Sequence, residues 1–217
     1  MPRVPVAERR SRLLDAAFAV IARGGVGAAT TRAVVQEAGM KLASFHYAFR
    51  SREQLLGELV EVVVGAQESV LDLPTDAGSG LAEVIELGLL GYFEQVRADP
   101  ARERAMFELT QYAMRTPGLE GLAERQYERY RALARASLLE AAERSGCSWP
   151  APEGPPAGEL VALTDGITLA WLADGDTARA HRALAFAARA LAAESVPSTS
   201  PAAPVRTSPS TRGTTHE

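Results

Sequence analysis

The chain has few of the residues that build disulfides or metal sites. Cys147 is the only cysteine among 217 residues, which excludes an intrachain disulfide and any site built from several thiolates. The three histidines, His46, His181 and His216, lie far apart, and no cluster of His, Cys and Asp has metal-ligand spacing. We therefore expect neither a metal ion nor a cofactor.

Long apolar runs are also missing. No uninterrupted stretch reaches the about 18 apolar residues that a membrane span requires. The segment from Met1 to Arg12 contains no apolar run of the kind found in signal peptides. Together with the scarcity of cysteine, these absences predict a cytoplasmic protein without a membrane partner.

The net charge of −4 is distributed unevenly along the chain. Residues 1–60 contain nine basic and five acidic residues, which gives 9 − 5 = +4, and the remainder contains 14 basic and 22 acidic residues, which gives 14 − 22 = −8. A basic head on an acidic body is typical of a protein that meets phosphates at one end, although many solvated surfaces also reach +4.

Apolar residues recur with the period of a helix throughout, and no alternating strand pattern occurs. Helices are expected over residues 7–23, 31–38, 42–48, 52–71, 80–97, 101–115, 117–144, 157–173 and 177–193. We predict an all-α chain of about nine helices. Its parts are a helix-turn-helix head at 1–50, a helical effector-binding and dimerisation body at 51–194, and a disordered Ser/Thr/Pro-rich tail at 195–217.

Several helix ends carry local signals. Thr30 or Thr31 is expected to cap the helix at 31. Ser51 and Gln54 read as a capping box that opens the helix at 52. Thr116 and Pro117 resemble a cap followed by a first-turn proline, so the next helix is expected to start there. Four prolines and two glycines within residues 146–156 predict a loop.

The three short helices at the N-terminus, with Gly39 between the second and third, indicate a helix-turn-helix unit. In such a unit the third helix presents short side chains to base edges in the major groove. Phe45 is expected to face the core. This leaves for DNA the polar side chains Lys41, Ser44, His46 and Tyr47, with Leu42 and Ala43 suited to thymine methyl groups. The alternatives are that Lys41 and His46 are merely solvated and that Tyr47 and Phe49 are both core residues.

The stretch TTRAVVQEAGMKLASFHYAFRSREQLL, Thr30–Leu56, resembles the DNA-binding signature of the TetR family. The resemblance covers roughly residues 8–60 and implies a three-helix head, a linking fourth helix and a dimerising ligand-binding body. It also implies DNA contacts by Thr31, Arg32, Lys41, Ser44, Tyr47 and Arg52, with the threonine and Arg52 on phosphate. An ion pair of Arg52 with a nearby glutamate is the alternative. The chain departs from the family at Lys41-Leu42 and at His46, so the operator sequence is not implied.

The segment Thr164–Asp176 resembles one that joins the last two helices of many members, where these helices pair with a second subunit. Apolar stripes with many alanines support such a four-helix interface. The predicted dimer contacts are Leu163, Ile167, Trp171, Leu184 and Leu191. Alternatively, both stripes face the core of their own chain.

Between the head and these helices, apolar and polar side chains are mixed as in a small-molecule pocket. The predicted ligand-binding residues are Tyr92, Phe93, Met106, Phe107, Gln111, Tyr112 and Tyr127. An amphipathic or aromatic organic effector is expected, acting on the head through the helix at 52–71. Ordinary packing is the alternative for any one of these residues.

The predicted function is a transcriptional repressor that an organic effector releases from a palindromic operator on double-stranded DNA. An enzyme is not expected, because no phosphate loop or nucleophile elbow occurs in the sequence. A helical adaptor that binds proteins, an activator, and a regulator that needs no effector remain alternatives.

Overall fold

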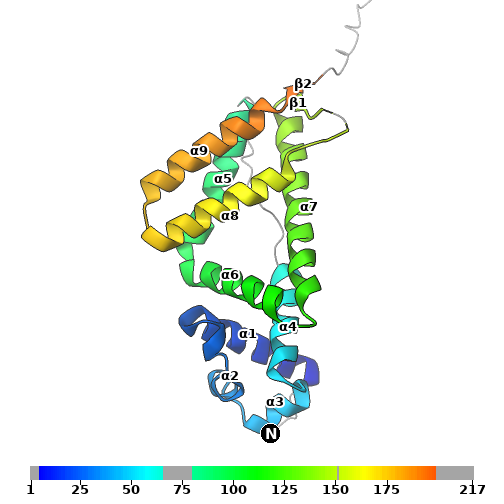
Figure 1. Ribbon diagram of the computed structural model, residues 1–217, viewed down its shortest axis with the longest axis vertical. Helices are drawn as coiled ribbons and strands as arrows, with labels where there is room; N and C mark the ends of the chain where they lie inside the picture. The colour runs from blue at the N-terminus through cyan, green and yellow to red at the C-terminus, as the bar shows by residue number, and fades with distance from the viewer. Residues whose placement is uncertain (1–4, 66–79, 151, 199–217) are drawn as a thin grey trace, which may run out of the picture.

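The computed structural model of the chain describes residues 5–65, 80–150 and 152–198 (Figure 1). Nine α-helices account for most of this described part: α1 (Val6–Gly24), α2 (Thr31–Glu37), α3 (Leu42–Ala48), α4 (Arg52–Gly65), α5 (Leu81–Ala98), α6 (Pro100–Arg115), α7 (Glu120–Arg144), α8 (Ala157–Asp174) and α9 (Thr177–Ala193). The short 3₁₀ helix η1 (Val26–Ala28) follows α1, and two strands of two residues each, β1 (Cys147–Ser148) and β2 (Val196–Pro197), pair antiparallel. The all-α prediction is confirmed.

The helices form an elongated molecule (Figure 1). The head, α1 to α3, lies at one end of the long axis, and α8 and α9 lie side by side toward the other end. Helix α6 lies between the head and α8, and α7 runs along the side of the body. Residues 66–71 of the predicted fourth helix and the tail from residue 199 lie outside the described residues.

Two predicted caps are present. The Thr30 hydroxyl accepts a hydrogen bond from the Ala33 N–H at 3.2 Å, and the Ser51 hydroxyl accepts one from the Gln54 N–H at 3.2 Å. The Gln54 side chain in turn accepts a bond from the Arg50 N–H at 2.7 Å, so the reciprocal bond reaches the residue before the cap rather than the Ser51 N–H of a standard capping box. The starts of α2 and α4 are therefore fixed by local side chains.

The predicted cap at Thr116 is wrong. Helix α7 begins at Glu120, and the Thr116 hydroxyl donates to the Tyr112 carbonyl at 2.8 Å, one turn back in α6. Because this hydroxyl satisfies the end of one helix, the chain makes a further turn at Pro117 and Gly118 before the next helix starts. The Leu119 N–H closes that turn on the Thr116 carbonyl at 3.0 Å.

Two hydrophobic cores organise the chain. The first contains the buried faces of α1 to α4 and extends into the body through Ala105, Leu109 and Ala113 of α6 and through the start of α7. The second joins α5, the later part of α7, α8 and α9. The core of the head thus continues across residue 50, where the sequence predicted a division.

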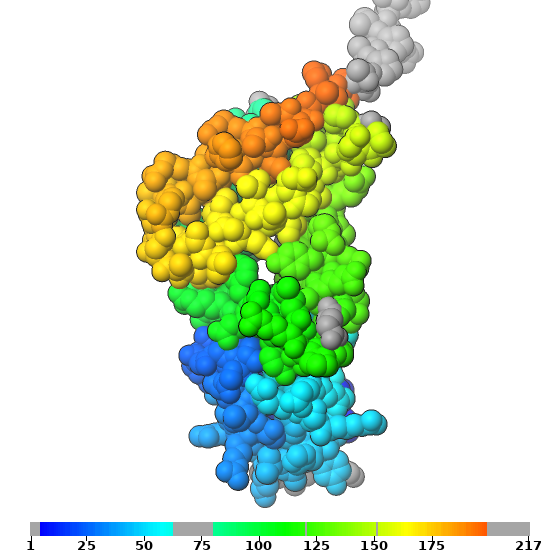
Figure 2. All heavy atoms as spheres, in the orientation of Figure 1, coloured from blue at the N-terminus to red at the C-terminus, as the bar shows by residue number. Residues whose placement is uncertain are grey.

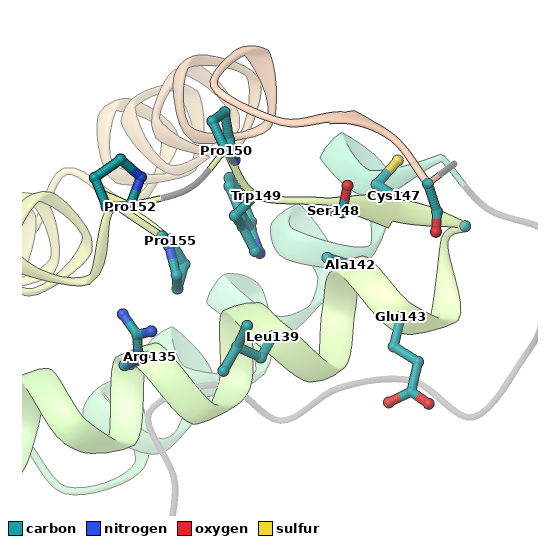
Figure 3. A pocket seen from close by; sticks show the side chains of 13 residues that line it. Arg135, Leu139, Ala142, Glu143, Cys147, Ser148, Trp149, Pro150, Pro152 and Pro155 are labelled. Carbon is teal, nitrogen blue, oxygen red and sulfur yellow. The ribbon is translucent and has the colours of Figure 1, made fainter. Parts of the chain in front are cut away.

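The proline-rich segment after α7 folds back along that helix (Figure 3). The Trp149 indole N–H donates to the Leu138 carbonyl at 3.1 Å, and Pro155 is buried. A groove of about 590 Å³ remains between this segment and α7 and is bordered by Arg135 and Leu139. The pairing of β1 with β2 gives Val196 and Pro197 a defined position, although the sequence predicted disorder from residue 195.

Candidate DNA-binding and effector sites

The turn between α2 and α3 is built around Gly39. Its φ of 63° lies in the left-handed region, which glycine adopts without the steric cost of a Cβ atom. The Gly39 N–H bonds to the Gln36 carbonyl at 3.1 Å, and the Met40 N–H bonds to the Val35 carbonyl at 2.8 Å. This pair of bonds ends α2 sharply and sets the direction of α3.

Helix α3 has one buried face and one exposed face. Phe45 and Phe49 are each 1% exposed, and their rings pack 5.6 Å apart. The opposite face carries the exposed side chains Lys41, Leu42, Ala43, His46 and Tyr47, while Ser44 is half-buried. Tyr47 is 73% exposed, so the alternative that it belongs to the core is wrong, whereas Phe49 is a core residue.

The buried side of α3 is braced by Arg10 of α1. Its guanidinium lies over the Phe49 ring at 4.5 Å, donates to the Ala48 carbonyl and forms an ion pair with Glu58 of α4. Arg10 therefore ties the end of α3 to two longer helices. Helix α3 lies at the end of the molecule opposite α8 and α9 (Figure 1).

The predicted contacts from α2 are Thr31 and Arg32. Both lie in the first turn of this helix, where Thr31 is half-buried and Arg32 is exposed. N–H groups at a helix start favour anions, which suits a phosphate position.

Arg52 does not occupy the position expected from the sequence. Its guanidinium donates to the Ala29 carbonyl at 2.8 Å and to the Val26 carbonyl at 2.5 Å, and it lies 5.8 Å from the centre of the Tyr112 ring. These bonds occupy two of the five guanidinium N–H groups with η1 and its neighbour, and they favour a structural role for Arg52 over the predicted phosphate contact. It joins α4, η1 and α6.

We expect Arg52→Ala to lower the free energy of unfolding by about 1–3 kcal/mol, the range for leaving polar groups without partners. The slope of operator affinity against salt should stay as in the parent, because no phosphate contact is lost. Chemical denaturation and duplex titrations at several salt concentrations measure the two quantities. A flatter salt slope in a variant of unchanged stability would restore Arg52 to the DNA interface.

Helix α6 contacts the head through Glu108. Its carboxylate accepts a hydrogen bond from the Val26 N–H at 2.7 Å, between residues 82 positions apart. The approach depends on Gly25, whose φ is 77° and where an added Cβ would lie 2.7 Å from Glu108 Oε2. Together with the contact of Tyr112 and Arg52, this bond makes α6 a direct link from body to head.

Inside the body, polar side chains gather around three tyrosines. The tyrosine cluster consists of Tyr92, Glu103, Tyr127, Tyr130 and Asp165, which come from α5, α6, α7 and α8. The Tyr127 hydroxyl donates to the Asp165 carboxylate at 2.5 Å, and the Tyr92 hydroxyl shares a hydrogen bond with Thr168 at 3.1 Å. The Tyr130 hydroxyl accepts from Gln126 at 2.8 Å.

All five side chains of the cluster are half-buried. Burial raises the pKa of Asp165 and of Glu103 above the ordinary values, and it raises the pKa of Tyr130 to about 12. The charges of Glu103 and Asp165 also contribute to the raised pKa values of Tyr92 and Tyr130, so these groups lie close enough to interact electrostatically. Where α8 passes α6 and α7, the molecular surface is hollowed (Figure 2).

The structure separates the predicted ligand-binding residues. Tyr92 and Tyr127 belong to the tyrosine cluster, and Met106 and Phe107 are half-buried on α6. Phe93 is fully buried between Trp171 and His181, so it is a core residue.

Two further predicted ligand-binding residues lie elsewhere: Gln111 is exposed, and Tyr112 contacts Arg52 at the head. The sequence prediction missed Glu103 and Asp165. A carboxylate within the largely apolar helix α8 was the available signal.

The predicted dimer contacts are likewise not all at the surface. Leu184 and Leu191 are 1% and 3% exposed and pack in the core of their own chain, so they offer no surface to a partner. Leu163, Ile167 and Trp171 are partly buried against the same core. The exposed faces of α8 and α9 instead carry Leu169 and Phe186, at 56% and 62% exposure.

Both the N-terminal and the C-terminal part of the chain match models of known protein families. Residues 13–59 match the family described as "Bacterial regulatory proteins, tetR family", and residues 82–195 match the C-terminal part of BetI-type transcriptional repressors. The chain belongs to the TetR family. This is a family of transcriptional regulators and not a class of enzymes.

A curated TetR-type relative supports the assignment. The HTH-type nicotine-responsive transcriptional repressor HdnoR of Paenarthrobacter nicotinovorans is 30% identical over 176 residues, which cover 79% of this chain and 88% of the relative.

Solved structures of similar proteins have the same fold. The multidrug binding protein EbrR, solved with imidazole, is 27% identical with a TM-score of 0.59, over 85% of this chain and 90% of that chain. A putative TetR-family regulator from Rhodococcus sp. is 21% identical with a TM-score of 0.66, over 85% and 98% of the two chains.

Within the described part of the chain, no helix combines the length and the apolar character that crossing a membrane would need. In the same residues, no group of three or more His, Cys, Asp and Glu side chains is arranged to hold a metal ion.

Proposed function

We propose that this TetR-family regulator is a homodimeric repressor that binds a palindromic operator through α3 and releases it when a small organic effector binds at the tyrosine cluster. One observation carries the DNA-binding part of the proposal. The polar and small side chains of α3 form its exposed face at the tip of the molecule, while its aromatic residues hold it on the head.

In this proposal α3 lies in the major groove. Lys41, Ser44, His46 and Tyr47 meet base edges or phosphates, and Leu42 and Ala43 lie near thymine methyl groups. Thr31 and Arg32, at the start of α2, contact the backbone. Residues 5–50 thus form the DNA-binding unit, although its core continues into α4 and α6.

The salt dependence of duplex binding tests this assignment. A dimer that neutralises six to ten phosphates is expected to lose about 10³–10⁵ in affinity between 50 and 200 mM salt. Fluorescence anisotropy of labelled duplexes with the full chain measures this slope. Binding that does not change with salt, or no binding to any duplex, would contradict the proposal and favour a protein-binding adaptor.

We expect Tyr47→Ala to weaken operator binding by about 1–3 kcal/mol per subunit, the range for a base-edge contact. Its thermal unfolding should change little, because Tyr47 is 73% exposed. Duplex titration and thermal denaturation measure the two effects. The matched control is Leu139→Ala, an exposed position on α7 for which operator affinity should equal that of the parent. Parental affinity in Tyr47→Ala would remove this residue from the interface.

The proposed dimer surface is the exposed side of α8 and α9. Ala162, Gly166, Leu169 and Ala173 share one exposed, uncharged stripe of α8, and a Cβ added at Gly166 would meet nothing within 4 Å. Phe186 adds an aromatic side chain from α9, which lies beside α8 (Figure 1). Small residues allow close approach of helices, as a four-helix interface between two copies requires.

The relatives support the effector part of the proposal. HdnoR is described as nicotine-responsive and EbrR as a multidrug binding protein, so small organic molecules are the effector class we propose here. The tyrosine cluster is where this chain combines aromatic and polar side chains from four helices. We place the effector there.

Helix α6 is the proposed route from effector to DNA. It carries Glu103 in the tyrosine cluster and Glu108 at the head, five residues or about 7.5 Å apart along the helix axis. A rigid shift of α6 caused by the effector would therefore move the Glu108 contact with Val26 and alter the spacing of the two heads. The sequence prediction assigned this role to the helix at 52–71, whereas the contacts of Glu108 and Tyr112 favour α6.

A further inference from the structure

The side chains of the tyrosine cluster restrict the charge of its ligand. Glu103 of α6 and Asp165 of α8 are two half-buried carboxylates close enough for the charge of one to raise the pKa of the other. Within the described part of the chain neither carboxylate forms an ion pair, and Asp165 accepts a hydrogen bond from the uncharged Tyr127 hydroxyl. A partly desolvated carboxylate without a cation is less favourable than one in water, so a bound cation would stabilise both groups.

Arg102, the cationic residue next to Glu103 in the sequence, does not neutralise the two carboxylates. The charge of Arg102 lowers the pKa of Glu103, but this effect is smaller than that of burial, and the pKa remains raised. The Arg102 guanidinium lies over the ring of Phe18 in the head, 5.6 Å from its centre. A second positive charge is therefore needed to balance both carboxylates.

The tyrosines provide the other half of a cation site. The hydroxyls of Tyr92, Tyr127 and Tyr130 already bond to Thr168, Asp165 and Gln126, which fixes the ring positions. The rings of Tyr127 and Tyr130 lie 5.8 Å apart at 61° to each other. Aromatic faces attract organic cations through their quadrupole, and inclined rings surround a cation from two sides.

We propose that the effector is an organic cation, either a protonated aliphatic amine that carries an aromatic ring or a quaternary ammonium compound, held by Glu103 and Asp165 among the three tyrosine rings. This inference rests on the proposed function, because it concerns the same effector site. An anionic effector would face two carboxylates, and a neutral one would leave both without a counter-charge.

Matched ligands of equal shape test the charge directly. One set consists of phenyltrimethylammonium and its neutral isostere tert-butylbenzene. The other consists of N-methyl-4-phenylpyridinium, neutral 4-phenylpyridine and biphenyl-4-carboxylate. Isothermal titration calorimetry with the full chain gives each Kd. At least one cation should bind more tightly than its neutral counterpart by about tenfold or more, and the carboxylate should bind most weakly.

Isosteric variants test whether the two carboxylates cause the preference for the cation. In the double variant Asp165→Asn, Glu103→Gln the cation should lose its advantage, leaving less than about a threefold difference from the neutral compound. Glu159→Gln is the matched control, because it removes an exposed carboxylate from the same helix as Asp165. The preference for the cation should survive in that variant.

Thermal unfolding checks that the double variant folds. The raised pKa values mean that the folded chain binds these protons more tightly than the unfolded chain, so ionised Glu103 and Asp165 destabilise the fold at neutral pH. The amides remove this cost. Without ligand the variant should therefore unfold at or above the parent temperature, and its advantage should vanish below the ordinary carboxyl pKa.

The inference is overturned if a neutral or anionic compound binds as tightly as the cations, if the preference survives the double variant, or if no compound of either set binds. Titration of the same preparation with duplex DNA separates this failure from a failure of the proposed function. A chain that binds duplex with the expected salt dependence but shows no cation preference refutes only the charge of the effector. A chain that binds no duplex refutes the function.

Discussion

Replacing Phe186 with glutamate is expected to separate the two subunits and to lower operator affinity by about 100- to 10,000-fold, the range in which linked binding sites exceed single ones. Phe186 is 62% exposed on α9, the helix beside α8, and α8 carries the uncharged stripe that contains Leu169. A carboxylate at this position would be desolvated against apolar side chains of the partner, and no cation of that stripe would neutralise it.

Analytical ultracentrifugation gives the mass of the Phe186→Glu variant, and anisotropy gives its operator affinity. Leu139→Glu is the matched control, because it places the same charge at an exposed leucine of α7, 46% exposed and beside the groove of Figure 3. This control should remain dimeric and bind the operator as the parent does. A dimeric Phe186→Glu variant would place the subunit interface elsewhere on the molecule.

The second large effect concerns communication between the two sites. In the parent, operator binding should weaken effector binding by about 5- to 150-fold, the usual range of allosteric coupling. Glu108→Ala should bring this ratio close to one, because α6 then has no acceptor for the Val26 N–H. Measurement of the effector Kd with and without saturating operator gives the ratio directly.

Glu108→Gln separates the hydrogen bond from the charge. Glutamine keeps an acceptor oxygen at the same distance from the backbone, so most of the coupling should remain. Loss of coupling in both variants would indicate that the negative charge matters rather than the bond. A parental ratio in Glu108→Ala would show that coupling does not depend on this hydrogen bond.

The parts of the head that were predicted correctly are those with local signals. The cap at Thr30, the turn at Gly39 and the spacing of Phe45 and Phe49 are all set within one or two helical turns, so the sequence alone determines them. The failed prediction at Thr116 has a related cause. A threonine hydroxyl can serve the helix on either side of it, and residue spacing does not distinguish the two choices.

The sites were less predictable because their partners come from distant parts of the chain. Arg52 bonds to carbonyls 23 and 26 positions away, and Glu103 interacts electrostatically with Asp165, which is 62 positions further along the chain. The periodicity of Leu184 and Leu191 indicates a buried stripe, but their assignment to the dimer interface was wrong. Periodicity does not indicate whether that stripe is buried by the same chain or by a second copy, and here it is the same chain.

Selection of bound duplexes from a random pool with the full chain tests the central claim, namely that α3 of each of two subunits lies in a DNA groove. The predicted result is an enriched palindrome whose half-sites are centred about one helical turn, 34 Å, or a multiple of it apart. Enrichment of a single asymmetric half-site, or no enrichment at moderate ionic strength, would contradict the account.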